Sequence, residues 1–204
     1  MVDLLDVDRL VRLHEASVER WHDVPITHDE REPLWKLILL NHAYNFQLWH
    51  EEDKARDPRA TDTEMARVKR AIDKLNQQRN DAAERIDEHL AGVLSEAGSA
   101  APADAPLNTE TPGSAVDRLS ILALKVFHMR EESARTDADA AHREKAAGRL
   151  AILLQQRTDL SGSLAALLED LAAGRKRLNL YRQMKMYNDP ALNPVLYRSA
   201  PKKA

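Results

Sequence analysis

Residues 68–94 read VKRAIDKLNQQRNDAAERIDEHLAGVL, and this stretch decides the fold class. Its apolar residues recur at helical intervals, which places them on one face of an α-helix: Val68, Ile72, Leu75, Ala82, Ile86, Leu90 and Val93. Upstream, Thr61 and Glu64 form the capping-box pattern that begins a helix. We therefore expect one helix over 61–97, roughly 50 Å long, which lies along a helical bundle.

The rest of the chain has the same helical composition. Ala, Leu, Arg, Glu and Gln are abundant, and the 6 Gly and 9 Pro residues cluster between the helical stretches. Further helices are expected over 5–21, 30–56, 114–135, 139–173 and 175–187. A low-complexity linker is expected over 98–112 and a non-helical tail over 188–204. These elements predict a single all-α domain, 1–204.

A shift of 78 residues superposes the second half of the chain on the first. The shift aligns Trp49 with Phe127, His50 with His128, Asp53 with Glu131, Gln77-Gln78-Arg79 with Gln155-Gln156-Arg157, and Asp81 with Asp159. We predict two repeated helical hairpins, over about 34–97 and 113–173. They form an up-down-up-down bundle to which an N-terminal helix and a C-terminal strap are added.

Composition excludes several classes of protein. Lys and Arg number 30 against 33 Asp and Glu, so the net charge of −3 argues against a nucleic-acid binder. Cysteine is absent, which excludes disulfides, thiolate metal sites and Cys nucleophiles. No apolar run is long enough to span a membrane, and the acidic start MVDLLDVD lacks the features of a signal peptide. We therefore expect a cytoplasmic protein.

The interior of the bundle is expected to contain one polar layer. Arg79 and Arg157 lie in the middle of the apolar stripes of their helices. Counting from the hairpin turns places Asp117 level with Arg157, and residues 40–42, which include His42, level with Arg79; the repeat puts Asp117 near the height of Arg79 as well. Three amides lie at the edges of this layer: Asn76, Asn80 and Gln156.

Two cations facing one carboxylate leave room for a negatively charged ligand. In this hypothesis Arg79 and Arg157 clamp the anion, Asp117 orients them and His42 is the candidate acid–base. A structural network of ion pairs, amides and buried water is the alternative, because ion pairs also occupy cores without a function. The basic tail could close over the layer as a lid that includes Tyr187, or its tyrosines could simply pack on the bundle.

A second layer nearer the hairpin turns holds two His–carboxylate pairs. His50 with Asp53, and His128 with Glu131, are three residues apart and share a helix face. The spacing is far looser than a metalloprotease signature, and the facing helices offer cations at this height, so we expect surface ion pairs and no metal. The sequence indicates no particular cofactor.

Four longer strings resemble a known family: NFQLWHEEDKAR, AIDKLNQQRND, LNTETPGSAVDRLSILALKVFHM and RQMKMYNDPALNPVLY. They are similar to an uncharacterised bacterial domain-of-unknown-function family of about this length. The resemblance implies an all-helical bacterial cytosolic protein. It suggests a context of glycosyltransferase and cell-envelope genes, and it brings no assigned catalytic residues.

Two functions from different classes follow. The first is binding or processing of a phosphate-bearing small molecule, a sugar phosphate or nucleotide, in the arginine-lined core. The second is a non-catalytic protein–protein interaction or scaffolding module linked to cell-envelope or glycan biosynthesis, as a homodimer or with another protein partner. Whether the protein is an enzyme stays open on these residues, because no acyl-transfer or nucleotide-fold motif is present.

Overall fold

The computed structural model describes residues 3–27, 29–99, 101–182, 184, 186 and 189–199. Its helices are α1 (Val7–Asp23), α2 (Pro33–Lys54), α3 (Asp62–Glu96), α4 (Pro112–Ala134), α5 (Ala140–Ala172) and α6 (Pro194–Ser199). In these ranges the one β-type pairing is a parallel bridge between Leu107 and Arg177. The predicted all-α class is confirmed.

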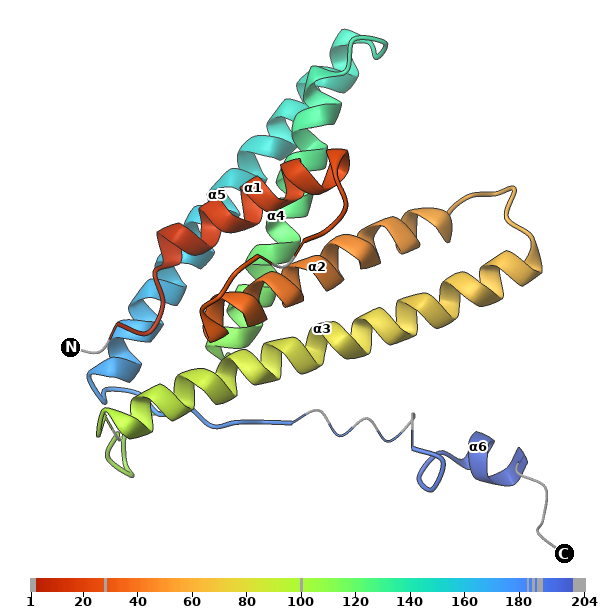
Figure 1. Ribbon diagram of the computed structural model, residues 1–204. Coiled ribbons are helices and arrows are strands. Elements are labelled where there is room, and N and C mark those ends of the chain that lie inside the picture. Colours follow the sequence, from red (N-terminus) through yellow and green to blue (C-terminus); the bar gives the residue numbers. More distant parts are fainter. Residues whose placement is uncertain are drawn as a thin grey trace, which may run out of the picture.

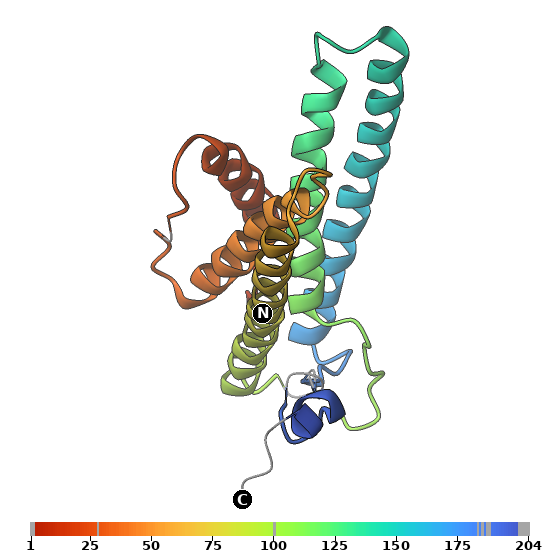
Figure 2. The same cartoon turned by 90° about the vertical axis from the view of Figure 1, so that its right-hand side faces the viewer.

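The helices form two antiparallel hairpins, α2 with α3 and α4 with α5. Their turns point in different directions, so the hairpins diverge from a shared end (Figures 1 and 2). α4 is the central helix, because it packs against α1, α2, α3 and α5. α3 and α5 contact each other little, and this separation decides where their polar residues lie.

Helix starts follow from capping side chains. Thr61 and Glu64 form a capping box at the start of α3, as expected. Thr111 accepts a hydrogen bond from the Ser114 backbone N–H at the start of α4, and Asp139 caps α5. Such caps satisfy backbone N–H groups that have no partner inside the helix.

The helix expected over 175–187 is wrong. The described residues from Arg175 to Arg182 run without helical structure after Gly174, whose φ of 67° ends α5. The Arg177 N–H donates to the Pro106 carbonyl at 3.0 Å, and the Arg177 carbonyl accepts from the Asn108 N–H at 3.3 Å. Pairing with the linker therefore takes the backbone groups that a helix would use. The tail, expected to be non-helical, carries α6.

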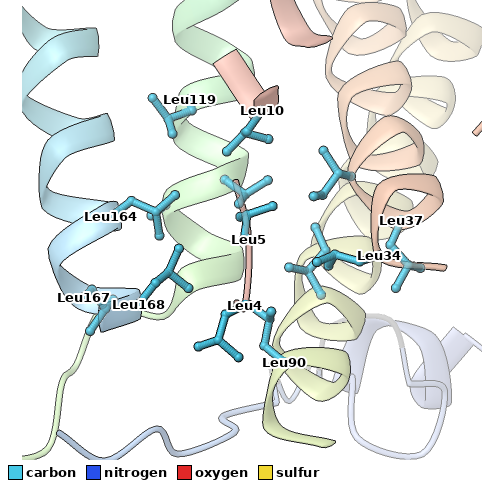
Figure 3. Packing of buried hydrophobic residues seen from close by; sticks show 14 of the residues in the cluster. Leu4, Leu5, Leu10, Leu34, Leu37, Leu90, Leu119, Leu164, Leu167 and Leu168 are labelled. Atoms are coloured by element: carbon cyan, nitrogen blue, oxygen red, sulfur yellow. The ribbon is translucent and has the colours of Figure 1, made fainter. Parts of the chain in front are cut away.

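The main core lies where the two hairpins meet. Leucines from α2 and α3 face leucines from α4 and α5, and Leu4, Leu5 and Leu10 of the N-terminal segment pack between them (Figure 3). The start of α4 is held against α3, because the Gly113 N–H donates to the buried Asp87 carboxylate at 2.6 Å. This contact anchors the second hairpin to the first.

The two hairpins have similar bounds. α3 begins at Asp62 and α5 begins at Ala140, which is 78 residues later. The Gln77 amide donates to Asp81 at 2.7 Å, and the Gln155 amide donates to Asp159 at 2.8 Å. These matches agree with the expected repeat, which stays a prediction.

Candidate functional site: a groove between α2, α3 and α4

The Asp117 carboxylate joins three helices. From α4, its Oδ1 atom accepts hydrogen bonds from the Nδ2 atoms of Asn41 and Asn45 on α2, both at 2.9 Å. The Arg79 guanidinium of α3 lies beside it, with Nε 3.8 Å from the same oxygen. Asn41 also donates to the Arg79 carbonyl at 3.1 Å. The sequence correctly placed Arg79 and Asp117 together.

His42 is connected to the Asp117 carboxylate through two other side chains. Its Nε2 lies 3.0 Å from the His14 carbonyl, which can only accept, so Nε2 carries the proton. Its Nδ1 is then the acceptor for the Ser120 hydroxyl at 2.7 Å. That hydroxyl oxygen accepts in turn from Asn45 at 2.9 Å. The chain of bonds runs from His42 through Ser120 and Asn45 to Asp117.

This network holds His42 as a neutral ring. The side chain is fully buried, and both ring nitrogens are in use. Burial lowers the pKa of His42 from 6.5 to about 3. The ring therefore orients Ser120 and Asn45, and it does not line the groove described next.

A groove of about 400 Å³ opens beside the Arg79–Asp117 pair. Its lining comes from α2, α3 and α4, with one further residue just after α2: Asn45, Leu48, Trp49, Glu52, Asp53, Arg56, Arg79, Ile121 and Leu124. Apolar side chains and an indole thus stand beside two guanidinium groups and two carboxylates. Such a mixture suits a ligand that carries both polar groups and a flat apolar face.

Two buried polar atoms of this groove have no hydrogen-bond partner within the described residues: Arg79 Nε and Asn45 Oδ1. Arg79 meets Asp117 only through the 3.8 Å contact, which is longer than a hydrogen bond. Native proteins seldom leave such groups unpaired, so each one calls for a water or a ligand. The donor and the acceptor belong to residues that line the same groove.

Arg157 does not join this site. It pairs with Glu15 of α1, and Arg130 of α4 approaches the same carboxylate at 3.4 Å. The expectation that Arg157 faces Arg79 across Asp117 is therefore corrected. The two arginines are also not in a dry core, because their side chains are 23% and 21% exposed. The diverging hairpins separate α3 from α5, which accounts for both differences.

The other residues predicted for the polar layer lie in different parts of the chain. Asn76 and Asn80 are half-buried on α3 near Arg79. Gln156 is exposed and lines a different, larger groove of about 780 Å³ between α4 and α5. Tyr187 lies outside the described residues, so its expected role in a lid is untouched by the structure.

The second polar layer forms the expected pairs. His50 Nδ1 lies 3.9 Å from Asp53, and His128 Nδ1 lies 2.8 Å from Glu131. His22 of α1 joins them, with ring centroids 5.3 Å from His50 and 5.2 Å from His128. Across the described ranges, no group of three His, Asp or Glu side chains is placed to hold a metal ion.

Five residues were not predicted from the sequence as part of a site. Asn41, Asn45 and Ser120 belong to the hydrogen-bond network of Asp117, Trp49 lines the groove, and Glu15 pairs with Arg157. Asn41 and Asn45 had a signal, because two amides four residues apart stand within the apolar run of α2. Ser120 lies 78 residues after His42, and the predicted repeat could have paired the two. Glu15 had no such signal in the sequence, because the repeat does not include α1.

Comparison with known proteins gives one match. A family model described as "Protein of unknown function (DUF4254)" matches residues 35–180, which is more than half of the chain. It includes Arg79, Asp117 and both asparagines, while α1 lies before it and most of the tail lies after it. No curated protein and no solved structure gives a significant match. No helix in the described part of the chain is long and apolar enough to cross a membrane.

Proposed function

Since the chain belongs to the DUF4254 family of proteins of unknown function, we propose a function from the groove itself: it binds a small phosphate-bearing molecule, with Arg79 as the anchor. The carrying observation is the guanidinium of Arg79, which is fixed beside Asp117 and has a buried Nε without a hydrogen-bond partner in the described residues. A planar guanidinium matches two phosphate oxygens at once.

The charges of the groove narrow the ligand class. Arg56 and Arg79 are accompanied by Glu52, Asp53 and the nearby Asp117, so a bare anion meets three carboxylates and only two cations. A sugar phosphate fits better, because its hydroxyls donate to carboxylates while its phosphate binds a guanidinium. Trp49 offers an indole to the apolar face of a sugar ring. We therefore place a phosphate-bearing sugar, free or as a nucleotide sugar, first.

In this proposal His42 is a positioning residue. It has no free ring nitrogen and acts on the groove only through Ser120 and Asn45. Asp117 orients Arg79, and Arg157 plays no part in binding because Glu15 occupies it. Binding, and not an acid–base reaction, is the activity that these contacts support.

Thermal unfolding of the purified protein tests the proposal against inorganic phosphate, a hexose 1-phosphate, a uridine diphosphate hexose and the free hexose. A ligand at 100 times its Kd stabilises by about 2.7 kcal/mol, which raises Tm by several degrees in a domain of this size. We expect this rise for a phosphorylated sugar, its loss in Arg79→Met and its retention in Arg157→Met. A rise that survives in Arg79→Met, or none with any probe, would refute the proposal.

The tail favours a second candidate, docking of a protein partner. Its apolar side chains are exposed in the described residues: Leu180, Tyr181, Met184, Met186, Leu192, Val195, Leu196 and Tyr197. Exposed apolar residues in such number are typical of interaction segments. Light scattering tests docking of a second copy of this chain, since a dimer that Tyr197→Asp disrupts supports it and a monomer excludes it. A partner from cell-envelope or glycan biosynthesis belongs to this second candidate.

A further inference from the structure

Five of the eight histidines lie along one seam, between α1 on one side and α2 and α4 on the other. His14 and His22 belong to α1, His42 and His50 to α2, and His128 to α4. Ring contacts connect them into an inner pair, His14 with His42, and an outer group of three. The proposed ligand groove lies between α2, α3 and α4, and Asp53 lies at the border between this groove and the seam.

The inner pair is dry and has no counter-charge. The rings of His14 and His42 stack with centroids 4.4 Å apart, and both side chains are buried. Neither ring nitrogen of His14 has a hydrogen-bond partner in the described residues. Burial lowers the pKa of both rings. The neighbouring His42 ring lowers the pKa of His14 further, whereas the hydrogen bond to the His14 carbonyl offsets part of the effect of burial on His42. No carboxylate acts on either ring in the described part of the chain.

The outer group has fewer carboxylates than rings. His22, His50 and His128 approach one another with centroids 5.2 to 6.1 Å apart. The facing acids are Asp53 beside His50 and Glu131 beside His128.

The surroundings of the outer rings also disfavour a third charge. The Nδ1 of His22 donates to the Val18 carbonyl, and within the described residues no acid forms an ion pair with this ring. Burial lowers the pKa of His50, the rings of His22 and His128 and then Lys54 also oppose its charge, and Asp53 offsets these effects only in part. With two carboxylates facing three rings, positive charges on all three rings would lie against one another.

We propose that this seam is a proton-sensitive latch: neutral imidazoles hold α1 against α2 and α4, and protonation of the inner pair releases α1. A charged His14 or His42 leaves the dry seam for water, and α1 is the element that moves. The other polar contacts of α1 include only half-buried or exposed ion pairs, those of Glu15 with Arg130 and Arg157 and of Arg9 with Glu30 and Glu32. Release uncovers the apolar faces of α2 and α4 that Val18 and Trp21 cover in the folded protein.

Hydrogen exchange of the full-length chain tests the latch, with rates corrected for the effect of pH on exchange chemistry. If opening exposes both inner rings, which protonate near pH 6.5 in water, the protection of α1 amides falls about 30-fold between pH 6.5 and pH 5.5, whereas α5 changes much less. In His14→Leu one titrating ring is gone, so the fall becomes about 5-fold. The matched control is His142→Leu, an exposed histidine of α5, which keeps the full dependence.

His50→Gln is the second variant, in case His14→Leu does not fold. The side chain of His50 is 37% exposed, so the substitution is tolerated, and it removes one of the three outer rings. We expect a weaker pH dependence of α1 protection here also. Protection of α1 that is independent of pH, or that falls equally in every helix, or that keeps the wild-type dependence in the variants that fold, would overturn the latch.

Discussion

At the scale of single residues, one carboxylate organises the interior between α2, α3 and α4. Asp117 accepts from Asn41 and Asn45 and lies 3.8 Å from Arg79. A carboxylate with two amide donors is well satisfied in a partly buried place, because each donor offsets part of its lost hydration. The same bonds fix the two asparagines, so the floor of the groove is preorganised before any ligand arrives.

Asp117→Ala is expected to destabilise the protein by about 2–4 kcal/mol, because it strands two buried amide donors and the Arg79 guanidinium together. Asp117→Asn keeps one oxygen for the two amides, so its cost is about half as large. Urea unfolding of the three proteins at pH 7.5 measures this. If the free energy of unfolding of Asp117→Ala is lower by less than about 0.5 kcal/mol, the carboxylate does not hold the two asparagines and Arg79 in place.

From the sequence, the predicted repeat put Asp117 near the height of Arg79, in one layer with it. It could not predict the partner of Arg157, because the position 78 residues before Asp117 is the buried Leu39. α2 therefore offers Arg157 no carboxylate at the equivalent place, and the guanidinium takes Glu15 of α1. A repeat predicts shared backbone positions, and the unshared side chains decide which polar contacts form.

At the scale of elements, the packing of α3 against α4 depends on one glycine. A Cβ atom at Gly113 would lie 2.3 Å from the Ala83 carbonyl oxygen and 2.8 Å from the Asp87 carboxylate. Only the absence of a side chain lets the first turn of α4 approach α3 and donate to Asp87. The raised pKa of Asp87, caused by its burial, shows how dry this contact is.

Gly113→Ala should therefore cost about 1–3 kcal/mol in free energy of unfolding, since backbone atoms must move to admit the methyl group. Gly148→Ala and Gly162→Ala are matched controls in α5, where an added Cβ meets nothing within 4 Å. Each control should stabilise by about 0.5–1 kcal/mol through helix propensity. Chemical denaturation decides the outcome, and a Gly113→Ala protein as stable as the controls would contradict the close approach.

Element boundaries were largely readable from sequence, because Thr61 and Asp139 are local capping signals. The prediction of a helix over 175–187 was wrong because a distant segment, and not a local signal, decides the structure there. Its backbone pairs with the linker at Pro106 and Asn108, some 70 residues away, and local propensity carries no information on such a partner. The angle between the hairpins was likewise unreadable, since it arises from contacts such as Gly113 with Asp87.

At the scale of the whole molecule, buried histidines make stability depend on pH. Burial lowers the pKa of His14 and His42, the latter to about 3, whereas both rings protonate near pH 6.5 once unfolded. The unfolded chain thus binds more protons below pH 6.5, and stability present above that pH is lost as the pH falls toward the folded pKa values.

We expect the free energy of unfolding, measured with urea, to fall between pH 6.5 and pH 5.0 by up to about 1.4 kcal/mol per pH unit for each of the two rings. Acids with lowered pKa, such as the exposed Glu64 and the half-buried Asp170, act only at lower pH because their unfolded values are below 5. Urea unfolding curves at pH 7.5, 6.5, 5.75 and 5.0 measure this dependence. A flat profile over this range would show that the rings are not buried as neutral groups.

The central claim is that Arg79 is an anion anchor and Arg157 is not. Nuclear magnetic resonance of arginine Nε–H groups, with a hexose 1-phosphate titrated into the full-length protein, observes both side chains in one experiment. The account predicts that the Arg79 resonance moves with saturation while the Arg157 resonance, tied to Glu15, stays in place. An Arg79 resonance that does not respond, or equal movement at both arginines, would contradict it.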